Sequence, residues 1–114
     1  MRIISRKFHA ILDYLWAAIL IAAPWLFGFS DSPIPRNTAI IMGLLTLFLS
    51  IITDYEGGIF RFLSMWTHLG VDITFGIFLA SAPWTIGFSD EVFLPHLLFG
   101  LFAIVAGLTT EGLT

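Results

Sequence analysis

The chain has 114 residues, 58% of them hydrophobic and only 11% charged, with a mean hydropathy of +0.96, so a water-soluble domain of this size could not cover its apolar surface. Its solvent must therefore be lipid, which makes the bilayer its first expected partner. The net charge of -3 gives no support to a nucleic-acid partner, and the absence of cysteine excludes disulfides and thiolate metal ligands.

Four stretches of 17 to 19 residues lack Asp, Glu, Lys and Arg and predict four transmembrane helices; in chain order they are 14–30, 37–53, 73–89 and 92–110. A helix of 17 residues covers about 25 Å, slightly less than a hydrocarbon core of roughly 30 Å, so the helices should extend past some flanking charges. The spans and short loops use nearly the whole length, which predicts a single membrane domain, residues 1–114.

The positive charges are distributed unequally between the two sides of this four-helix arrangement. Arg2, Arg6, Lys7 and Arg61 fall on one side, whereas Arg36 alone falls on the other. By the positive-inside rule, both termini and the middle loop should be cytoplasmic. We therefore expect a multi-pass protein of the cell (inner) membrane.

The chain contains an internal repeat. A shift of 59 positions aligns 9–31 with 68–90 without a gap, and ten of the 23 aligned positions are identical, including Ala-Pro-Trp-x-x-Gly-Phe-Ser-Asp. After a two-residue gap the second helices also align, Gly43 with Gly100 and Thr53 with Thr110. Repeat one spans 9–55 and repeat two 66–114, each with two membrane spans. The predicted fold is all-α: four transmembrane helices as two tandem parallel helical-hairpin repeats, related by a pseudo-two-fold axis along the membrane normal.

A Pro-Trp at the end of the first helix of a two-helix unit, followed by Gly-Phe-Ser-Asp and present twice, resembles the SPW-repeat family of small bacterial and archaeal integral membrane proteins. The resemblance covers nearly the whole chain. Ala23 and Ala82 stand where the family has serine before Pro-Trp. The resemblance implies a membrane fold; it implies no established biochemical activity.

The prolines of the motif lack an N–H, so the helices that contain them should kink or end early. The Gly-Phe-Ser-Asp that follows offers a flexible exit and a side chain that can start a turn or cap the next helix. We interpret the motif as a structural corner anchored by tryptophan at the membrane interface; the alternative is a gate or ligand site at the outer face. The residues assigned to this motif are Pro24, Trp25, Gly28, Asp31, Pro83, Trp84, Gly87 and Asp90.

Two polar pairs share the same spacing. His9 and Asp13 are four residues apart, as are His68 and Asp72, so each pair lies on one helical face. Asp72 is the only charged residue within 62–89, and an ionised carboxylate at such depth is normally paired, protonated or turned toward the bundle interior. The pseudo-two-fold could bring both pairs together between the first and third helices. His9, Asp13, His68 and Asp72 are therefore the candidate polar cluster.

Three interpretations of this cluster are open. Each Asp could bind its own His or a neighbouring helix and so fix the packing of the bundle, which is the interpretation we favour. The two His and two Asp could instead hold a divalent metal ion, or the two His a haem. They could also line a path for protons or ions. On the favoured interpretation no metal and no cofactor are expected.

The sequence contains no nucleophile elbow, His-Glu-x-x-His motif, phosphate loop or cysteine pair, so we do not expect an enzyme. Four short helices bury little surface between them, and phenylalanine at 12 positions adds apolar surface for lateral partners. We expect a small non-catalytic membrane protein, a structural or accessory subunit that self-associates or joins a larger membrane complex. The alternative is a proton- or cation-handling transporter or channel-like oligomer that uses the paired His and Asp residues.

Overall fold

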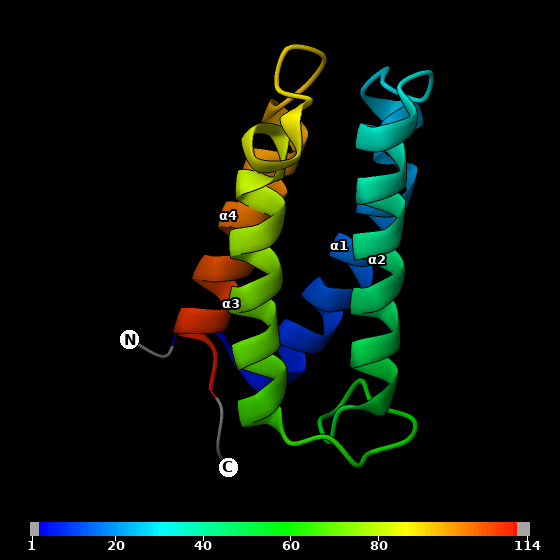
Figure 1. Ribbon diagram of the computed structural model, residues 1–114. Coiled ribbons are helices and arrows are strands. Elements are labelled where there is room, and N and C mark those ends of the chain that lie inside the picture. The colour runs from blue at the N-terminus through cyan, green and yellow to red at the C-terminus, as the bar shows by residue number, and fades with distance from the viewer. Residues whose placement is uncertain (1–2, 112–114) are drawn as a thin grey trace.

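The computed structural model describes residues 3–111, which form four α-helices: α1 Arg6–Leu26, α2 Pro33–Ile52, α3 Met65–Ala82 and α4 Leu94–Thr109. A short π-helical turn, η1 Pro83–Gly87, continues α3. Figure 1 shows α1 paired with α2 and α3 paired with α4, with the long loop 53–64 at one end of the molecule and the two short turns at the other. The arrangement is two helical hairpins side by side.

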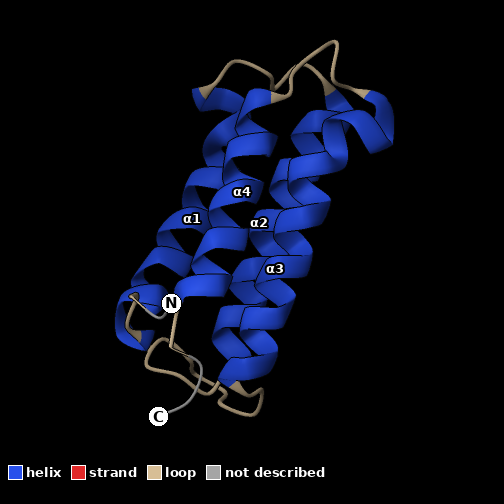
Figure 2. Cartoon of the chain, turned by 90° about the vertical axis from the view of Figure 1, so that its left-hand side faces the viewer, coloured by secondary structure: helices blue, strands red, loops and turns tan. Residues whose placement is uncertain are grey.

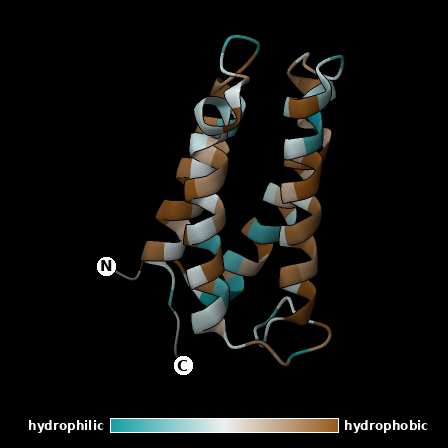
Figure 3. Ribbon diagram, viewed as in Figure 1, coloured by the Kyte–Doolittle hydropathy of each residue, from teal (hydrophilic) through white to brown (hydrophobic). Residues whose placement is uncertain are grey.

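The helices are long and apolar enough for a membrane protein. The segments Arg6–Leu26, Pro33–Ile52 and Met65–Gly87 each meet the length and hydropathy of a membrane span, and α4 is a shorter apolar helix of 16 residues, about 24 Å long. Large apolar side chains are exposed on all four helices, and Figure 3 shows hydrophobic residues along much of the length of α2 and α3. The predicted all-α fold, a polytopic membrane protein of two tandem hairpins, is confirmed, and α1 and α3 extend beyond their uncharged stretches to include Asp13 and Asp72.

The first helix of each hairpin begins in the same way. Ser5 and Ser64 are the N-cap residues of α1 and α3, and their hydroxyl oxygens accept hydrogen bonds from the backbone N–H groups of Phe8 and Thr67. These bonds satisfy donors that a helix start leaves without an intrahelical partner. Since a shift of 59 positions superimposes the two caps, the equivalence of the repeats extends upstream of His9 and His68.

Within each hairpin the two helices cross where their backbones come close. In the second hairpin, a methyl group added at Gly100 would lie 2.4 Å from the Ala80 nitrogen and 2.6 Å from the Gly76 oxygen. In the first, a methyl group at the equivalent Gly43 would lie 2.6 Å from an Ile21 side-chain carbon and 3.0 Å from the Ala17 oxygen. Small residues at equivalent positions therefore set the crossing in both hairpins.

Backbone hydrogen bonds link the two hairpins crosswise at the end of the molecule that carries loop 53–64, which is the lower end in Figure 2. Ile4 donates to the Thr109 carbonyl and accepts from the Glu111 N–H, both at 3.0 Å. Leu63 makes the equivalent pair, donating to the Ile52 carbonyl at 2.9 Å and accepting from the Asp54 N–H at 2.6 Å. The segment before the first helix of each repeat thus pairs with the end of the second helix of the other repeat.

The interior is divided between two kinds of residue. Toward the short turns the core is apolar, built from Trp16, Leu20, Ala23, Phe29, Ala39, Met42 and Leu79. Toward loop 53–64 the buried residues include most of the ionisable side chains of the interior, namely His9, Asp13, His68 and Asp72. The buried acidic side chains of the interior described here, Asp13 and Asp72, therefore lie at this second end.

Candidate functional site

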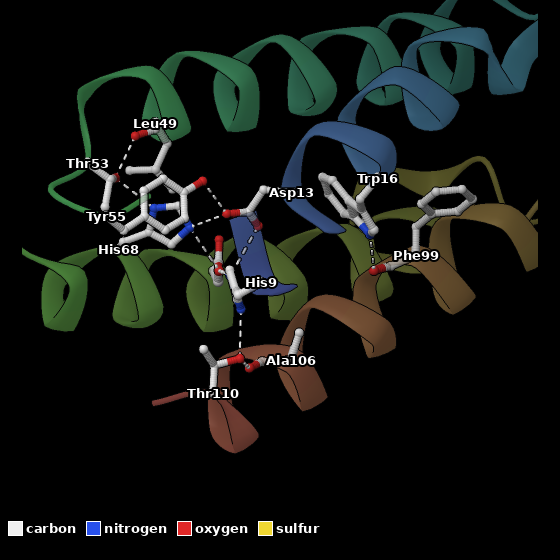
Figure 4. Close-up of polar contacts among 11 residues, drawn as sticks. His9, Asp13, Trp16, Leu49, Thr53, Tyr55, His68, Phe99, Ala106 and Thr110 are labelled. Carbon is white, nitrogen blue, oxygen red and sulfur yellow. Dashed lines mark hydrogen bonds and ion pairs between the residues drawn. The ribbon is translucent and has the colours of Figure 1, made fainter. Parts of the chain in front are cut away.

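Two imidazoles and two carboxylates meet at the end of the bundle that carries loop 53–64 (Figure 4). His9 and Asp13 come from the first turns of α1, and His68 and Asp72 from the first turns of α3. Each residue is almost fully buried, with an exposed fraction between 0% and 7%. The structure brings together all four residues of the polar cluster proposed from the sequence.

Each imidazole contacts both carboxylates through its Nε2 atom. His9 Nε2 lies 3.1 Å from Asp13 Oδ1 and 2.8 Å from Asp72 Oδ2. His68 Nε2 lies 3.2 Å from Asp72 Oδ2 and 2.9 Å from Asp13 Oδ2. The contacts at four-residue spacing are present, but the shorter contact of each histidine is with the carboxylate of the other hairpin. The cluster therefore joins the hairpins.

Two threonine hydroxyls orient the imidazoles by contacting Nδ1, the ring nitrogen that does not face the carboxylates (Figure 4). The Thr53 hydroxyl donates to the Leu49 carbonyl at 2.6 Å and lies 2.7 Å from His68 Nδ1. The Thr110 hydroxyl donates to the Ala106 carbonyl at 2.6 Å and lies 2.7 Å from His9 Nδ1. Because a hydroxyl has one proton and it goes to the carbonyl, the hydroxyl oxygen must accept from Nδ1–H. Both histidines thus carry a proton on Nδ1.

These threonines were not identified as site residues from the sequence, although the repeat alignment paired Thr53 with Thr110. The contacts are crosswise: His9 of repeat one meets the threonine of repeat two, and His68 of repeat two meets the threonine of repeat one. The repeat alignment was therefore the signal that could have found them. The alignment alone did not predict that each threonine would contact the histidine of the other repeat.

Tyr55 in loop 53–64 closes the cluster on one side. Its buried hydroxyl donates to Asp13 Oδ2 at 2.7 Å (Figure 4). Burial, together with the neighbouring Asp13 carboxylate, raises the pKa of the Tyr55 hydroxyl above its ordinary value, so the group stays protonated and remains a donor. The same loop is held to α1 by the Tyr14 hydroxyl, which donates to the Gly57 carbonyl at 2.6 Å.

The prolines and glycines of the duplicated motif lie at the opposite end, where the first helix of each hairpin stops. α1 ends two residues after Pro24, and α3 changes at Pro83 into the π-helical turn η1, which ends at Gly87. Gly28 and Gly87 have φ angles of +76° and +107°, values that side chains other than hydrogen rarely adopt. Each motif therefore turns the chain out of its helix.

The tryptophans and aspartates of the motif are exposed at this end, namely Trp25, Trp84, Asp31 and Asp90. The N-cap residues of α2 and α4 are Ser32 and Phe93, so of the two roles expected for the Gly-Phe-Ser-Asp side chains, starting a turn or capping the next helix, the structure shows the turn. The aspartates instead lie within turns, in which the Ser32 and Glu91 N–H groups donate to the Phe29 and Phe88 carbonyls. The chain leaves each turn before the next helix starts.

Comparison with known protein families adds one finding to this geometry. The family model described as the SPW repeat domain matches residues 7–110. The chain belongs to the SPW-repeat family. Neither the comparison with curated proteins nor the comparison with solved structures gave a match.

Both SPW repeats of this chain carry alanine before Pro-Trp, and Ala23 and Ala82 are completely buried. Ser81, one position earlier in the second repeat, donates to the Phe78 carbonyl of its own helix at 3.2 Å. The position that carries serine in the family name is therefore an apolar packing position here.

The Gly-Phe-Ser-Asp segments of the SPW repeats supply two buried rings that enclose a third histidine. The ring of His96 lies 5.3 Å from that of Phe29 and 4.8 Å from that of Phe88, measured between centroids. His96 Nε2–H donates to the Pro35 carbonyl at 3.0 Å. His96 was not assigned a role from the sequence; it joins α4 to the start of α2.

A cavity of about 20 Å³ adjoins the cluster and is lined in part by His9, Asp13 and Asp72. It has room for about one water molecule. A haem does not fit between the two histidines of the SPW repeats, because their ring centroids are only 5.4 Å apart and the carboxylates contact both Nε2 atoms. The space beside the cluster is therefore large enough for one water molecule or a single small ion.

Proposed function

We propose that this chain is a non-catalytic membrane subunit, in which the cluster fixes the two hairpins against each other and the outer surface meets lateral partners. One observation carries the proposal: the buried polar groups at one end of the bundle connect opposite hairpins. α1 packs chiefly on α2 and α3 chiefly on α4, with fewer contacts between the pairs. Contacts between hairpins at the cluster, such as His9 with Asp72 and His68 with Asp13, would therefore decide how the hairpins fit together.

The absence of catalysis is part of the proposal, and the direction of the threonine hydrogen bonds supports it. A hydroxyl nucleophile is activated when it donates its proton to an imidazole. Thr53 and Thr110 do the reverse, since each donates to a backbone carbonyl and accepts from a histidine. The imidazoles therefore cannot act as bases toward these hydroxyls in the arrangement described.

We also propose that the protein lies in the cell (inner) membrane with both termini cytoplasmic. Arg6 and Lys7 are the first two residues of α1, and Arg61 lies in loop 53–64, at the same end of the bundle (Figure 1). Arg36 lies at the opposite end, near the start of α2. Arg2, the remaining basic residue, falls outside the described residues. This imbalance is the one that the positive-inside rule associates with the cytoplasmic side.

Two apolar grooves between the hairpins support lateral association. One lies between α1 and α4 and the other between α2 and α3, and the repeat alignment relates their walls: Ile19, Leu98 and Phe99 of the first correspond to Phe78, Ile41 and Met42 of the second. We propose a second copy of the chain as the partner, because two related grooves on opposite sides suit a symmetric assembly. A larger membrane complex would use the same surfaces.

The experiment that tests this proposal is mass determination of the protein in lipid nanodiscs by native mass spectrometry. We expect a defined oligomer, and we expect replacement of Leu98 in the groove by Trp to dissociate it, because the larger ring would fill the space that the partner occupies. Val105→Trp, at an exposed position on α4 outside the residues lining the groove, is the matched control and should leave the oligomer intact. A strict monomer with no copurifying protein would contradict the proposal.

A second candidate function is the handling of protons or cations, which the cavity beside His9, Asp13 and Asp72 favours. Toward the short turns, however, the core residues Leu20 and Leu79 are apolar and fully buried. A polar cluster at one end and an apolar core at the other support access of a proton or cation from one end of the bundle, rather than a polar path across the membrane. Proton or cation flux in proteoliposomes that disappears in the double variant Asp13→Asn, Asp72→Asn would support this second candidate.

A further inference from the structure

We propose that His9, Asp13, His68 and Asp72 form a binding site for one divalent transition-metal ion, with Zn²⁺ the best match. This inference goes beyond the proposed function and does not depend on self-association. It takes up the metal-site interpretation that the sequence left open, in place of the packing interpretation favoured there. Its basis is the arrangement of donor atoms, their orientation and the chemical type of the ligands.

The four residues place one donor atom each within 4.8 Å of all the others. The four nitrogen-to-oxygen contacts run from 2.8 to 3.2 Å. In a tetrahedral zinc site with bonds of about 2.0 to 2.1 Å, neighbouring donor atoms are about 3.3 Å apart. To surround the ion, the four nitrogen-to-oxygen contacts would lengthen by about 0.1 to 0.5 Å, and the widest donor separations, up to 4.8 Å, would shorten by about 1.5 Å. The side chains are therefore already close to a coordinating arrangement.

The orientation of both histidines suits metal binding. Thr53 and Thr110 accept the Nδ1–H protons, so each imidazole presents Nε2 to the carboxylates. Ligating histidines characteristically donate their other ring N–H to a fixed acceptor, which sets the tautomer and holds the ring. Asp13 has an equivalent support in the Tyr55 hydroxyl. The groups surrounding the cluster are thus those that a metal site requires.

The Nε2 atom of His68 supplies an independent observation. This atom is fully buried and has no hydrogen-bond partner in the described residues, although carboxylate oxygens lie 2.9 and 3.2 Å from it. Its lone pair or proton is therefore not aligned with either oxygen. A buried Nε2 atom that lies near two carboxylates without a hydrogen bond to either is available as a metal ligand.

The ligand set selects the class of ion. Two imidazole nitrogens and two carboxylate oxygens suit Zn²⁺ and other divalent first-row metals, whereas Mg²⁺ and Ca²⁺ prefer all-oxygen sites. With neutral histidines, the two carboxylate charges balance one divalent cation, which matters in an interior where net charge is costly. In the rival arrangement a proton sits on Nε2 of each histidine. The two positive imidazolium rings then balance the two carboxylates, and the cluster is neutral without a metal ion.

Metal analysis of the full-length protein separates these arrangements. We expect protein purified in mild detergent and supplied with Zn²⁺ to retain about one ion per chain, and the Co²⁺-loaded protein to show the strong visible bands of four-coordinate cobalt. Asp72→Asn should reduce metal content at least about tenfold, because an amide replaces the anionic ligand. Asp90→Asn, at an exposed position in a turn of the same hairpin, should keep the full content.

Two outcomes would overturn the metal site. One is folded, helical wild-type protein that holds neither Zn²⁺ nor Co²⁺, which would favour the protonated cluster. The other is Asp72→Asn that binds as much metal as the wild type. If Asp72→Asn fails to fold, the cobalt titration of the wild-type protein decides alone. None of these results depends on the oligomeric state, so failure here leaves the proposed subunit role open.

Discussion

The hydroxyl groups of Thr53 and Thr110 determine which nitrogen of each cluster histidine faces the carboxylates. A threonine in an apolar helix usually donates to the carbonyl one turn earlier, and both of these do so. That ordinary bond leaves the hydroxyl oxygen as an acceptor for an imidazole N–H from the opposite hairpin. Each threonine thus sets the tautomer of the histidine that it contacts.

Replacing Thr110 by Val should destabilise the protein by about 1 to 2 kcal/mol, because the His9 Nδ1–H would be left buried without its acceptor. The measurement is the free energy of unfolding in mixed micelles of increasing denaturing detergent. Thr109→Val is the matched control: the neighbouring hydroxyl makes the same kind of bond, to Val105, but lies outside the cluster. Equal losses in the two variants would show that the histidine contact contributes nothing.

At the scale of the helices, the geometry depends on the small residues at each crossing. Gly76 and Gly100 bring α3 and α4 together, and Ala17 and Gly43 do the same for α1 and α2. Because the repeat alignment relates these sites, both hairpins cross at equivalent small residues. The cluster depends on it, since the crossings help set where the first turns of α1 and α3 lie.

Gly100→Ala should lower the free energy of unfolding by about 2 to 3 kcal/mol, because the added methyl group would meet backbone atoms of α3 rather than movable side chains. Gly70→Ala, within α3, is the control. A methyl group there meets nothing within 4 Å, so this variant should be neutral or slightly more stable. The idea of a backbone-to-backbone crossing fails if both variants unfold at the same detergent concentration.

At the scale of the whole molecule, the two ends of the bundle differ in character. One end carries the buried cluster beneath loop 53–64, whereas the other carries the exposed tryptophans of the two SPW repeats. The proposed orientation places the cluster end toward the cytoplasm. A metal ion or proton would then reach the cluster from the cytoplasmic side.

Single cysteines introduced into this cysteine-free chain can test the orientation. In intact cells, a membrane-impermeant maleimide should label Asp90→Cys, whereas Glu56→Cys should react only after the cells are permeabilised. Both native side chains are exposed, so access to the reagent should depend on the side of the membrane. Labelling in the opposite order would reverse the assigned topology.

The sequence predicted much of this architecture because its strongest signals are local. Uncharged stretches indicated the spans, and the duplicated motif indicated two equivalent hairpins. The equal spacing of the His and Asp residues indicated the four members of the cluster. Each of these signals depends on residues close together in the chain or on a fixed repeat distance.

The contacts that complete the cluster were not visible in this way. His9 and Thr110 are 101 positions apart, and Tyr55 reaches Asp13 from a loop whose path no periodicity specifies. The burial of His96 between Phe29 and Phe88 likewise requires the two motif turns to lie side by side. These contacts follow from how the hairpins pack, which local patterns do not encode.

The crosswise pairing of histidines and threonines has an evolutionary consequence. In this structure each histidine bonds the threonine of the other hairpin. A lone hairpin would therefore need a second hairpin to form the same pair of contacts. Two identical hairpins could supply this as a homodimer whose assembly depends on concentration. Duplication and fusion make the encounter intramolecular, and they free one half to diverge: Tyr55 of the first copy aligns with Gly112 of the second, which lies outside the described residues.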